Sequence, residues 1–568
     1  MISGGQIIYN NLMRKNIKDV FLYSGGAIMP LIDCFYKGKI NYYINSNEQN
    51  GCHAAVGYAK STNKTGVMIT TSGPGITNCI TPILDSTNDS TPLVVFSGQV
   101  SLNTMGSCAF QESPATEITK PITKWSYCVK DISELDSVID EAFYIANDKK
   151  KGAVHIDLPK CIISSKTKYV DHIDKIYEKT NEDIFNLKIA DKINKSEKPV
   201  LYIGQGCNNY SEELRKLVDK FQLPITTTMH AMGAYDERNE LSLQMCGMHG
   251  SYVANKALQN ADCIIAIGAR FDDRTTGLPS KYAPIAKNNK AIIHCNIENS
   301  EIDKNIKSNY SYTGDAGIFI NHLIENLEIK ERKLWLNQLN IWKNQHPFEF
   351  KNAGSGQIKT QNVLVELNKQ TQKRDDIIYT FGVGNHLMMG CQFLDWKDPK
   401  TILASGSLGV MGCSIGYSIG AQIANLDKTI ISIDGDGSFN MTLTDLKTIK
   451  EYNLPIKIAI INDESLSMVR IWEKLFFEER YVATDNPNNP DYVNLAKSYG
   501  IHAISCDSID ELGETINEFL ECKDPILCEF KVIGEECLPL VGPGKALDDM
   551  ILFRDYNNID LSDCEVPC

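Results

Sequence analysis

The chain has 568 residues, of which 43% are hydrophobic and 23% charged, and its net charge is −14 at pH 7. That length exceeds what one hydrophobic core supports, so we expect several domains. The acidic balance argues against nucleic acid or an anionic membrane as a partner, and no run of about 18 apolar residues predicts a membrane span. The amino terminus resembles neither a signal peptide nor a transit peptide, which favours a cytoplasmic location.

The first domain, expected over residues 1–165, alternates strand and helix patterns. Gly26 lies in a glycine turn, which has the spacing of neither a dinucleotide-binding nor a Walker loop. Glu48 comes near the start of a helix predicted over 51–60; taken alone, it is a carboxylate that satisfies free helix amides. The alternation is typical of a doubly wound α/β sheet, with strands predicted at 20–23, 41–44, 66–71, 93–98 and 153–158.

A second α/β domain is expected over residues 190–330. Its predicted strands each end in turn or polar residues, as parallel strands of such a sheet do. Gly204 and Gly206 lie in the turn after the first of them. The strands are predicted at 199–203, 224–228, 263–268 and 292–297.

The third domain, expected over residues 365–535, contains a strand–turn–helix–strand pattern. A strand over 429–434 ends in the turn Gly435-Asp436-Gly437-Ser438, a helix is predicted over 441–452, and a second strand ends at Ile461. Parallel strands with a right-handed crossover end at the same edge of the sheet. Open α/β sheets bind their ligands at that edge.

Two carboxylates follow these two strands. Asp436 comes after the first strand and Asp463 after the second. Mg²⁺ takes hard oxygen ligands, usually one or two carboxylates together with phosphate oxygens, and neighbouring glycines let a phosphate approach the backbone. An ordinary turn with a helix-capping Asp would explain Gly-Asp-Gly alone, but not the second oxygen donor. The pattern therefore predicts a site for a metal and a phosphate.

These residues also carry a family resemblance. Gly435-Asp436-Gly437-Ser438 together with Asn462-Asp463 resembles the GDG…NN motif of thiamine diphosphate enzymes, and the surrounding sequence resembles the catalytic subunit of acetohydroxyacid (acetolactate) synthase. Matching blocks follow in order over nearly the whole chain. The family has a second Asn at position 463, where Asp still offers oxygen to Mg²⁺ but adds negative charge beside the diphosphate. The resemblance adds Ser465 to the metal site.

The resemblance assigns further residues to thiamine diphosphate. Glu48 would contact the pyrimidine ring and so promote loss of the C2 proton. Gly409 would lend its carbonyl to the aminopyrimidine, and Met411 would hold the cofactor bent, although Met411 alone indicates only core packing. The other implied contacts are Val383, Asn385 (usually Gln in the family), His386, Gly435, Gly437, Ser438 and Met468.

Five residues and the tail are implied at the substrate side. Gly26 would face the reacting end of the cofactor. Phe110 and Gln111 would line the active site from the partner subunit; alone, they indicate a polar loop with one anchoring Phe. Lys160 would add positive charge to the substrate channel, and Trp472 would form a wall of the acceptor pocket. The tail, residues 536–568, resembles a closing lid.

The second domain resembles the family's flavin-binding domain. The resemblance lies in Met245–Ser251 and Ile267–Gly277 and implies a non-redox FAD. Asn296 replaces the family's usual Asp, and an inherited domain without flavin is the alternative. The implied contacts are Gly204, Gly206, His249, Gly250, Arg270 and Asp315.

The resemblance implies a carboligase of branched-chain amino acid biosynthesis that decarboxylates pyruvate and joins the acetyl unit to a second 2-oxo acid. Active sites would lie between the subunits of a homodimer or homotetramer, and a regulatory subunit is a further candidate partner. Two alternatives stay open. Asn103 and Cys108, where the family usually has Arg and Asp, and Asp463 leave room for a 2-oxo acid decarboxylase or a different acceptor. The other alternative is a non-catalytic, cofactor-binding paralogue, against which the intact Glu48 and Asp436 argue.

Overall fold

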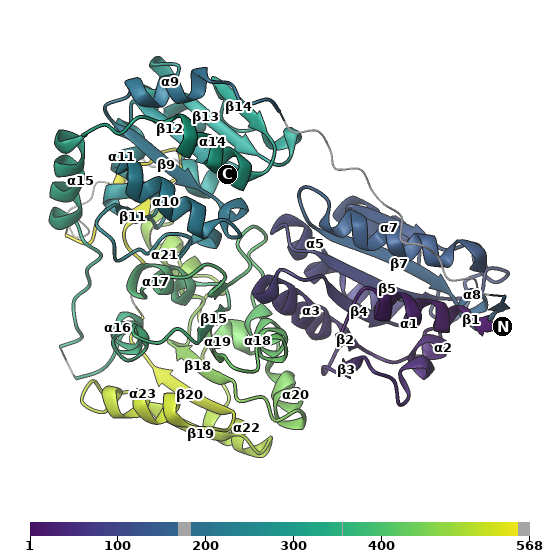
Figure 1. Ribbon diagram of the computed structural model, residues 1–568. Helices are drawn as coiled ribbons and strands as arrows, with labels where there is room; N and C mark the ends of the chain where they lie inside the picture. Colours follow the sequence, from purple (N-terminus) through teal and green to yellow (C-terminus); the bar gives the residue numbers. More distant parts are fainter. Residues whose placement is uncertain (169–182, 355, 535, 555–568) are drawn as a thin grey trace.

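A computed structural model describes residues 1–168, 183–354, 356–534 and 536–554 of the chain (Figure 1). Three six-stranded sheets with all strands parallel follow one another along the sequence, and helices cover them. The predicted fold class, α/β with three doubly wound parallel sheets, is confirmed. In Figure 1 the first domain lies at the right, the central domain at the upper left and the third domain below it.

The first sheet has the strand order β3-β2-β4-β5-β7-β6. Strands β4 and β5 are buried along their whole length, as expected for a parallel sheet covered on both faces. The edge strand β6 was not predicted. The strands are β2 Asp19–Leu22, β3 Asn41–Tyr43, β4 Gly66–Thr70, β5 Leu93–Gln99, β6 Trp125–Cys128 and β7 Ala153–Pro159. The helices are α1 Gly4–Arg14, α2 Met29–Ile32, α3 Glu48–Thr62, α4 Pro74–Asn78, α5 Ile80–Asn88, α6 Ala115–Thr119, α7 Leu135–Asn147 and α8 Lys160–Ser164.

The central sheet has the strand order β11-β10-β9-β12-β13-β14. The four predicted strands form its middle, and two short strands extend its edges. The strands are β9 Pro199–Ile203, β10 Ile225–Thr227, β11 Ser242–Met245, β12 Cys263–Ile267, β13 Ile292–Asn296 and β14 Tyr310–Thr313. The helices are α9 Lys188–Lys195, α10 Ser211–Phe221, α11 Tyr252–Asn260, α12 Asp273–Thr276, α13 Pro284–Asn288, α14 Ala316–Asn326 and α15 Lys333–Gln345.

The third sheet has the strand order β16-β15-β17-β18-β20-β19. Its two innermost strands, β17 and β18, are the two strands of the predicted strand–turn–helix–strand pattern. The strands are β15 Ile377–Phe381, β16 Ile402–Leu403, β17 Thr429–Gly435, β18 Lys457–Asn462, β19 His502–Cys506 and β20 Ile526–Lys531. The helices are α16 Thr360–Thr371, α17 Asn385–Phe393, α18 Cys413–Ala424, α19 Asp436–Phe439, α20 Leu446–Glu451, α21 Ser467–Phe476, α22 Tyr492–Ser498 and α23 Leu512–Glu521.

The helix predicted over 441–452 is confirmed only over Leu446–Glu451, and its predicted start is wrong. The chain forms the single turn α19 immediately after β17, a 3-10 turn at Leu443–Asp445, and then the short helix α20. Tertiary hydrogen bonds interrupt the helical pattern: the Thr442 hydroxyl donates to the Gly412 carbonyl at 2.9 Å. The buried carboxylate of Asp445 accepts from the backbone N–H of Ser46, in the first domain, at 2.7 Å.

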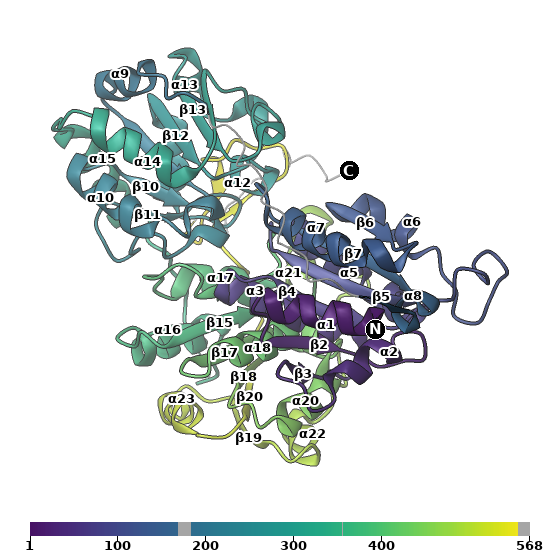
Figure 2. The ribbon, with the colours of Figure 1, turned by 45° about the vertical axis from the view of Figure 1, so that its right-hand side comes forward.

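Helices α3 and α18 join the first domain to the third (Figure 2). One hydrophobic core runs through both domains and includes Val56 of α3 and Ile419 of α18. Glycines allow the close crossing: a Cβ on Gly57 would lie 2.4 Å from the Tyr417 carbonyl oxygen, and one on Gly420 would lie 1.8 Å from that of Ala54. The two helices therefore touch backbone to backbone.

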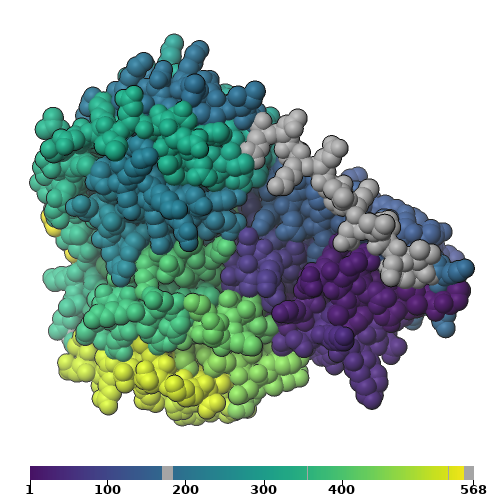
Figure 3. Space-filling view, viewed as in Figure 1, coloured from purple at the N-terminus to yellow at the C-terminus, as the bar shows by residue number. Residues whose placement is uncertain are grey.

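The described part of the tail, residues 536–554, packs on the central domain. Its strands β21 Leu540–Val541 and β22 Met550–Ile551 pair antiparallel. Leu547 is buried in the central core, and Asp548 accepts from Lys256 Nζ at 2.8 Å. The lid function stays a prediction, and residues 555–568 lie outside the described part. On the face shown in Figure 3 the three domains pack against one another.

Candidate active site

The two predicted metal-binding carboxylates converge at one edge of the third sheet. Strands β17 and β18 pair in parallel register from Ile431–Lys457 to Gly435–Ile461, so Asp436 and Asp463 emerge side by side. Burial raises the pKa of Asp436. Burial, followed by the negative charge of Asp436, raises the pKa of Asp463 to about 6. A buried and a half-buried carboxylate that repel each other form a place where a cation is favoured.

Two asparagines that the sequence did not single out complete this cluster. The side-chain amides of Asn486 and Asn489 each donate to Asp436 Oδ2 at 2.8 Å. The Ser465 hydroxyl is buried without a hydrogen-bond partner in the described part of the chain. A carboxylate pair beside an unpartnered hydroxyl is an all-oxygen donor set, which fits Mg²⁺. The only sequence signal for the asparagines was the turn-forming run from Asn486 to Pro490.

Most of the residues expected on the diphosphate side also gather here. The His386 ring lies against Gly435, with Nδ1 3.0 Å from the place of a Cβ. Burial lowers the pKa of His386 to about 4, so its ring is neutral, and its buried Nε2 has no hydrogen-bond partner among the described residues. The Ser438 hydroxyl accepts from the Gly412 N–H at 2.8 Å. The Nε2 atom faces the buried Asp434 carboxylate, 3.6 Å from its Oδ1, so the Nδ1 side of the ring is the side that lies at Gly435.

Gly409 and Met411 lie over the same edge of the sheet. Gly409 is exposed with a φ of 72°, and the nearest atom to the place of its Cβ is Val383 Cγ1, 4.0 Å away. The Met411 Cε atom lies 3.7 Å from the place of a Cβ on Gly437. Asn385 is the first residue of α17, and Met468 lies in α21 beside the tail.

Glu48 begins α3 and is buried, and its Oε2 accepts from the Asn78 amide at 2.8 Å. This hydrogen-bond partner of Glu48 thus lies in the first domain and not in the Asp436 cluster. Asn47 caps the helix by accepting from the Asn50 N–H at 2.8 Å. Gly26 is exposed, with nothing within 4 Å of the place of its Cβ. The sequence did not single out Asn78 because an amide at the end of the short helix α4 has no local signal for this contact.

The remaining substrate-side residues are dispersed. Phe110 is 89% exposed in a loop that Glu112 closes by accepting from the Ala109 N–H at 2.9 Å. Gln111, with a φ of 59°, follows it, and Lys160 is exposed at the start of α8. Trp472 lies on α21 against Phe476, with ring centroids 5.1 Å apart. Among the described residues of the single chain, Phe110 makes no hydrogen bond or ring contact with the Asp436 cluster.

The residues implied for FAD lie at or near the carboxyl-end edge of the central sheet. Gly204 and Gly206 pack closely on the Gly268 backbone. Gly250 lies in the turn beside His249, whose Nδ1 is 3.1 Å from the Cys537 carbonyl oxygen and whose Nε2 is buried without a partner in the described chain. Arg270 and Asp315 are engaged within the protein: Arg270 donates to the Asn88 carbonyl at 2.8 Å, and Asp315 caps α14. Asn296 donates to the Ala269 carbonyl at 3.0 Å.

Three family models match the chain in order. They are the N-terminal TPP binding domain of thiamine pyrophosphate enzymes at residues 2–118, their central domain at 187–323 and their C-terminal TPP binding domain at 382–530. The fold and the carboxylate edge of the third sheet thus define a thiamine pyrophosphate enzyme.

Curated relatives narrow this class. The chain is 39% identical to the mitochondrial acetolactate synthase catalytic subunit of Saccharomyces cerevisiae, over 97% of this chain and 84% of that protein. It is 36% identical to chloroplastic acetolactate synthase 2 of Nicotiana tabacum, over 97% and 85%, and to the acetolactate synthase large subunit of Parasynechococcus marenigrum, over 97% and 91%. The chain belongs to the acetolactate synthase family. The predicted enzyme class, a thiamine-diphosphate-dependent carboligase, is confirmed.

The described residues also limit how a membrane or a metal could be bound. They contain no helix that is both long and apolar enough to cross a membrane. They also contain no group of three or more His, Cys, Asp or Glu side chains placed to hold a metal ion. A metal at Asp436 and Asp463 would therefore need further oxygen ligands, which phosphate groups supply in Mg²⁺ sites.

Proposed function

We propose that this protein decarboxylates pyruvate and joins the acetyl unit to a second 2-oxo acid, which gives 2-acetolactate or 2-aceto-2-hydroxybutyrate. The observation that supports the proposal most is the convergence of Asp436, Asp463 and the buried His386 ring at one sheet edge, in a chain of the acetolactate synthase family. Carboxylates suit a divalent cation, and a buried imidazole beside glycine backbone suits a diphosphate.

Thiamine diphosphate supplies, when bound, the carbon nucleophile that attacks a 2-oxo acid. Asp436, Asp463 and Ser465 would hold Mg²⁺, which neutralises the diphosphate. Glu48 would hold a proton at the pyrimidine ring, and Asn78 fixes the Glu48 carboxylate through its 2.8 Å hydrogen bond. The protein's contribution is thus to bind, to orient and to hold this proton, while Trp472 shapes the space for the acceptor acid.

A second copy of the chain would complete the site. Glu48 contacts Asn78 in its own domain, and Phe110 presents a ring that is 89% exposed. A large exposed aromatic side chain on an ordered loop is typical of a protein interface. We therefore expect a homodimer as the smallest active unit, with a tetramer as the alternative. Relatives named as catalytic or large subunits support a regulatory partner.

FAD is proposed for the carboxyl-end edge of the central sheet. Strands β9, β12 and β13 end there beside Gly204, Arg270 and Asn296, and such edges are where α/β sheets bind ligands. The unpartnered Nε2 of His249 is the polar atom left for a ligand. A flavin absorbance band in the purified protein, removed by Arg270→Ala, would support the proposal; colourless protein that takes up no added FAD would refute it.

Product analysis tests the main proposal. The purified protein is incubated with pyruvate, Mg²⁺, thiamine diphosphate and FAD, and acetolactate and acetaldehyde are measured together. Acetolactate in excess supports the carboligase. Acetaldehyde in excess would instead show a 2-oxo acid decarboxylase, for which the substitutions at Asn103, Cys108 and Asp463 are the sequence argument. A repeat with 2-oxobutyrate as second substrate reports the acceptor preference.

A further inference from the structure

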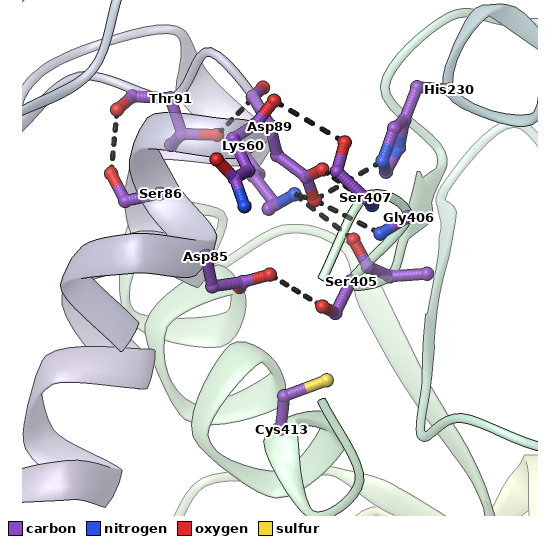
Figure 4. Close-up of polar contacts among 12 residues, drawn as sticks. Lys60, Asp85, Ser86, Asp89, Thr91, His230, Ser405, Gly406, Ser407 and Cys413 are labelled. Atoms are coloured by element: carbon purple, nitrogen blue, oxygen red, sulfur yellow. Dashed lines mark hydrogen bonds and ion pairs between the residues drawn. The ribbon is translucent and has the colours of Figure 1, made fainter. Parts of the chain in front are cut away.

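A buried carboxylate, Asp89, lies where all three domains meet (Figure 4). It follows α5 in the first domain and is 1% exposed. Lys60 Nζ of α3 donates to its Oδ2 at 2.7 Å. The Nε2 atom of His230, in the central domain, lies 3.2 Å from the same oxygen. The sequence analysis did not single out Asp89, and the proposed reaction assigns it no role.

The third domain supplies the remaining contacts of Asp89. The backbone N–H of Gly406 donates to Oδ2 at 3.1 Å and that of Ser407 donates to Oδ1 at 2.9 Å. Lys60 also donates to the carbonyl of Ala404 at 3.0 Å. The Asp89–Lys60 pair therefore fixes three residues of another domain, Ala404, Gly406 and Ser407, each through its backbone.

A second aspartate, Asp85, fixes the same segment. The Ser405 hydroxyl donates to Asp85, and it also accepts from the backbone N–H of Val410 at 3.0 Å. Burial, followed by the negative charge of Asp89, raises the pKa of Asp85 to about 6. Burial alone would also raise the pKa of Asp89, but Lys60 holds it well below its usual value. The carboxylate that receives the two backbone amides is thus the one that stays ionised, and charged acceptors form the stronger hydrogen bonds.

The segment held in this way, residues 404–411, leads from β16 to α18 and contains Gly409 and Met411. Gly406, Ser407 and Gly409 of this segment are exposed, and outside the two aspartates Ser407 is held by its hydroxyl, which accepts from Arg270 at 2.7 Å and donates to the Asn88 carbonyl at 3.3 Å. We propose that Asp89 is a positioning residue for the cofactor, because it holds segment 404–411 in the conformation in which Gly409 and Met411 face thiamine diphosphate. This inference rests on the proposed function. It adds to that function a residue that lies outside the candidate active site.

The test is Asp89→Asn in the full-length protein. The amide keeps the shape but removes the charge, and hydrogen bonds to a neutral acceptor are weaker than those to a charged one. We expect amide hydrogen exchange in segment 404–411 of the cofactor-free protein to rise about tenfold or more. The dissociation constant of thiamine diphosphate, measured by fluorescence titration with Mg²⁺, should rise by a similar factor.

Asp140→Asn is the matched control. The Asp140 side chain is 3% exposed and pairs with Lys15 Nζ at 2.7 Å, and its recorded contacts lie within the first domain. This control should leave both the exchange of segment 404–411 and the cofactor affinity as in the unchanged protein. If Asp89→Asn folds poorly, the double variant Lys60→Met/Asp89→Asn removes the buried ammonium as well and keeps the test.

The outcomes separate the two proposals. Unchanged exchange in segment 404–411, or an equal rise in Asp140→Asn, would overturn the role of Asp89. Faster exchange with unchanged thiamine diphosphate affinity would overturn its link to the cofactor. A wild-type protein that binds no thiamine diphosphate would overturn the proposed function, while the exchange measurement would still report whether Asp89 holds the segment.

Discussion

The contact between α3 and α18 allows a quantitative prediction for Gly57→Ala. A Cβ at Gly57 would lie 2.4 Å from both Cα and the carbonyl oxygen of Tyr417, whereas ordinary contact begins at 3.4 Å. The helices would therefore have to separate by about 1 Å, because neither backbone atom can turn away. Overpacking of this kind costs about 1–3 kcal/mol, and the better helix propensity of Ala returns about 1 kcal/mol.

We expect Gly57→Ala to be destabilised by about 2 kcal/mol, since the clash is with backbone. For domains of this size that corresponds to a fall of about 4–8 °C in the unfolding temperature. Gly513→Ala is the control: Gly513 also lies in a helix, α23, but its Cβ would meet only Glu366 Oε1 at 3.5 Å. Its unfolding temperature should stay equal or rise. Calorimetry of both variants decides, and a Gly57→Ala protein as stable as Gly513→Ala would refute the reasoning.

Three further predictions concern single side chains. Glu48→Gln should remove most of the activity and slow exchange of the thiamine diphosphate C2 proton, measured by NMR; retained exchange would exclude the proposed role. Asp463→Asn should weaken Mg²⁺ binding and strengthen thiamine diphosphate binding at limiting Mg²⁺, because one negative charge beside Asp436 is lost; equal cofactor affinity in a titration would contradict this. Burial lowers the pKa of His53 to about 3, and neither ring nitrogen has a partner in the described chain, although the ring packs on Tyr417. Only the unfolded state then takes up a proton below about pH 6.5, so this stability loss grows as the pH falls toward 3. We therefore expect His53→Phe to gain about 1.3 kcal/mol more at pH 5.5 than at pH 7; equal shifts of the thermal midpoint at both pH values would count against it.

Local sequence patterns were sufficient to predict the fold class and the two carboxylates at the centre of the candidate site. The β-branched run 429–434 predicted β17, because a buried parallel strand needs apolar residues on both faces. The turn at Gly435–Gly437 placed Asp436 at the strand end. Adding the strand that ends near Ile461 was enough to predict that Asp436 and Asp463 meet, since the crossover rule fixes the edge at which both strands end.

Other features depend on contacts between residues far apart in sequence. The pattern over 441–452 has helical spacing, yet Asp445 is held by Ser46, 399 positions away, and the helix starts late. The pairing of Asp436 with Asn486 and Asn489 spans 50 and 53 positions and leaves no periodic signal.

The contacts of Asp89 show most clearly that local sequence patterns do not predict contacts between distant residues. Its hydrogen bonds to Gly406 and Ser407 span 317 and 318 positions, and its partner Lys60 belongs to another helix. Periodicity and turn residues predict which face of a helix or strand is buried and where the chain turns. They do not predict which buried faces pack against each other. The sequence by itself therefore determined most strands of the first two sheets and the edge at which Asp436 and Asp463 meet, whereas only the packing of α3, α5 and α18 decided which charges hold segment 404–411 in place.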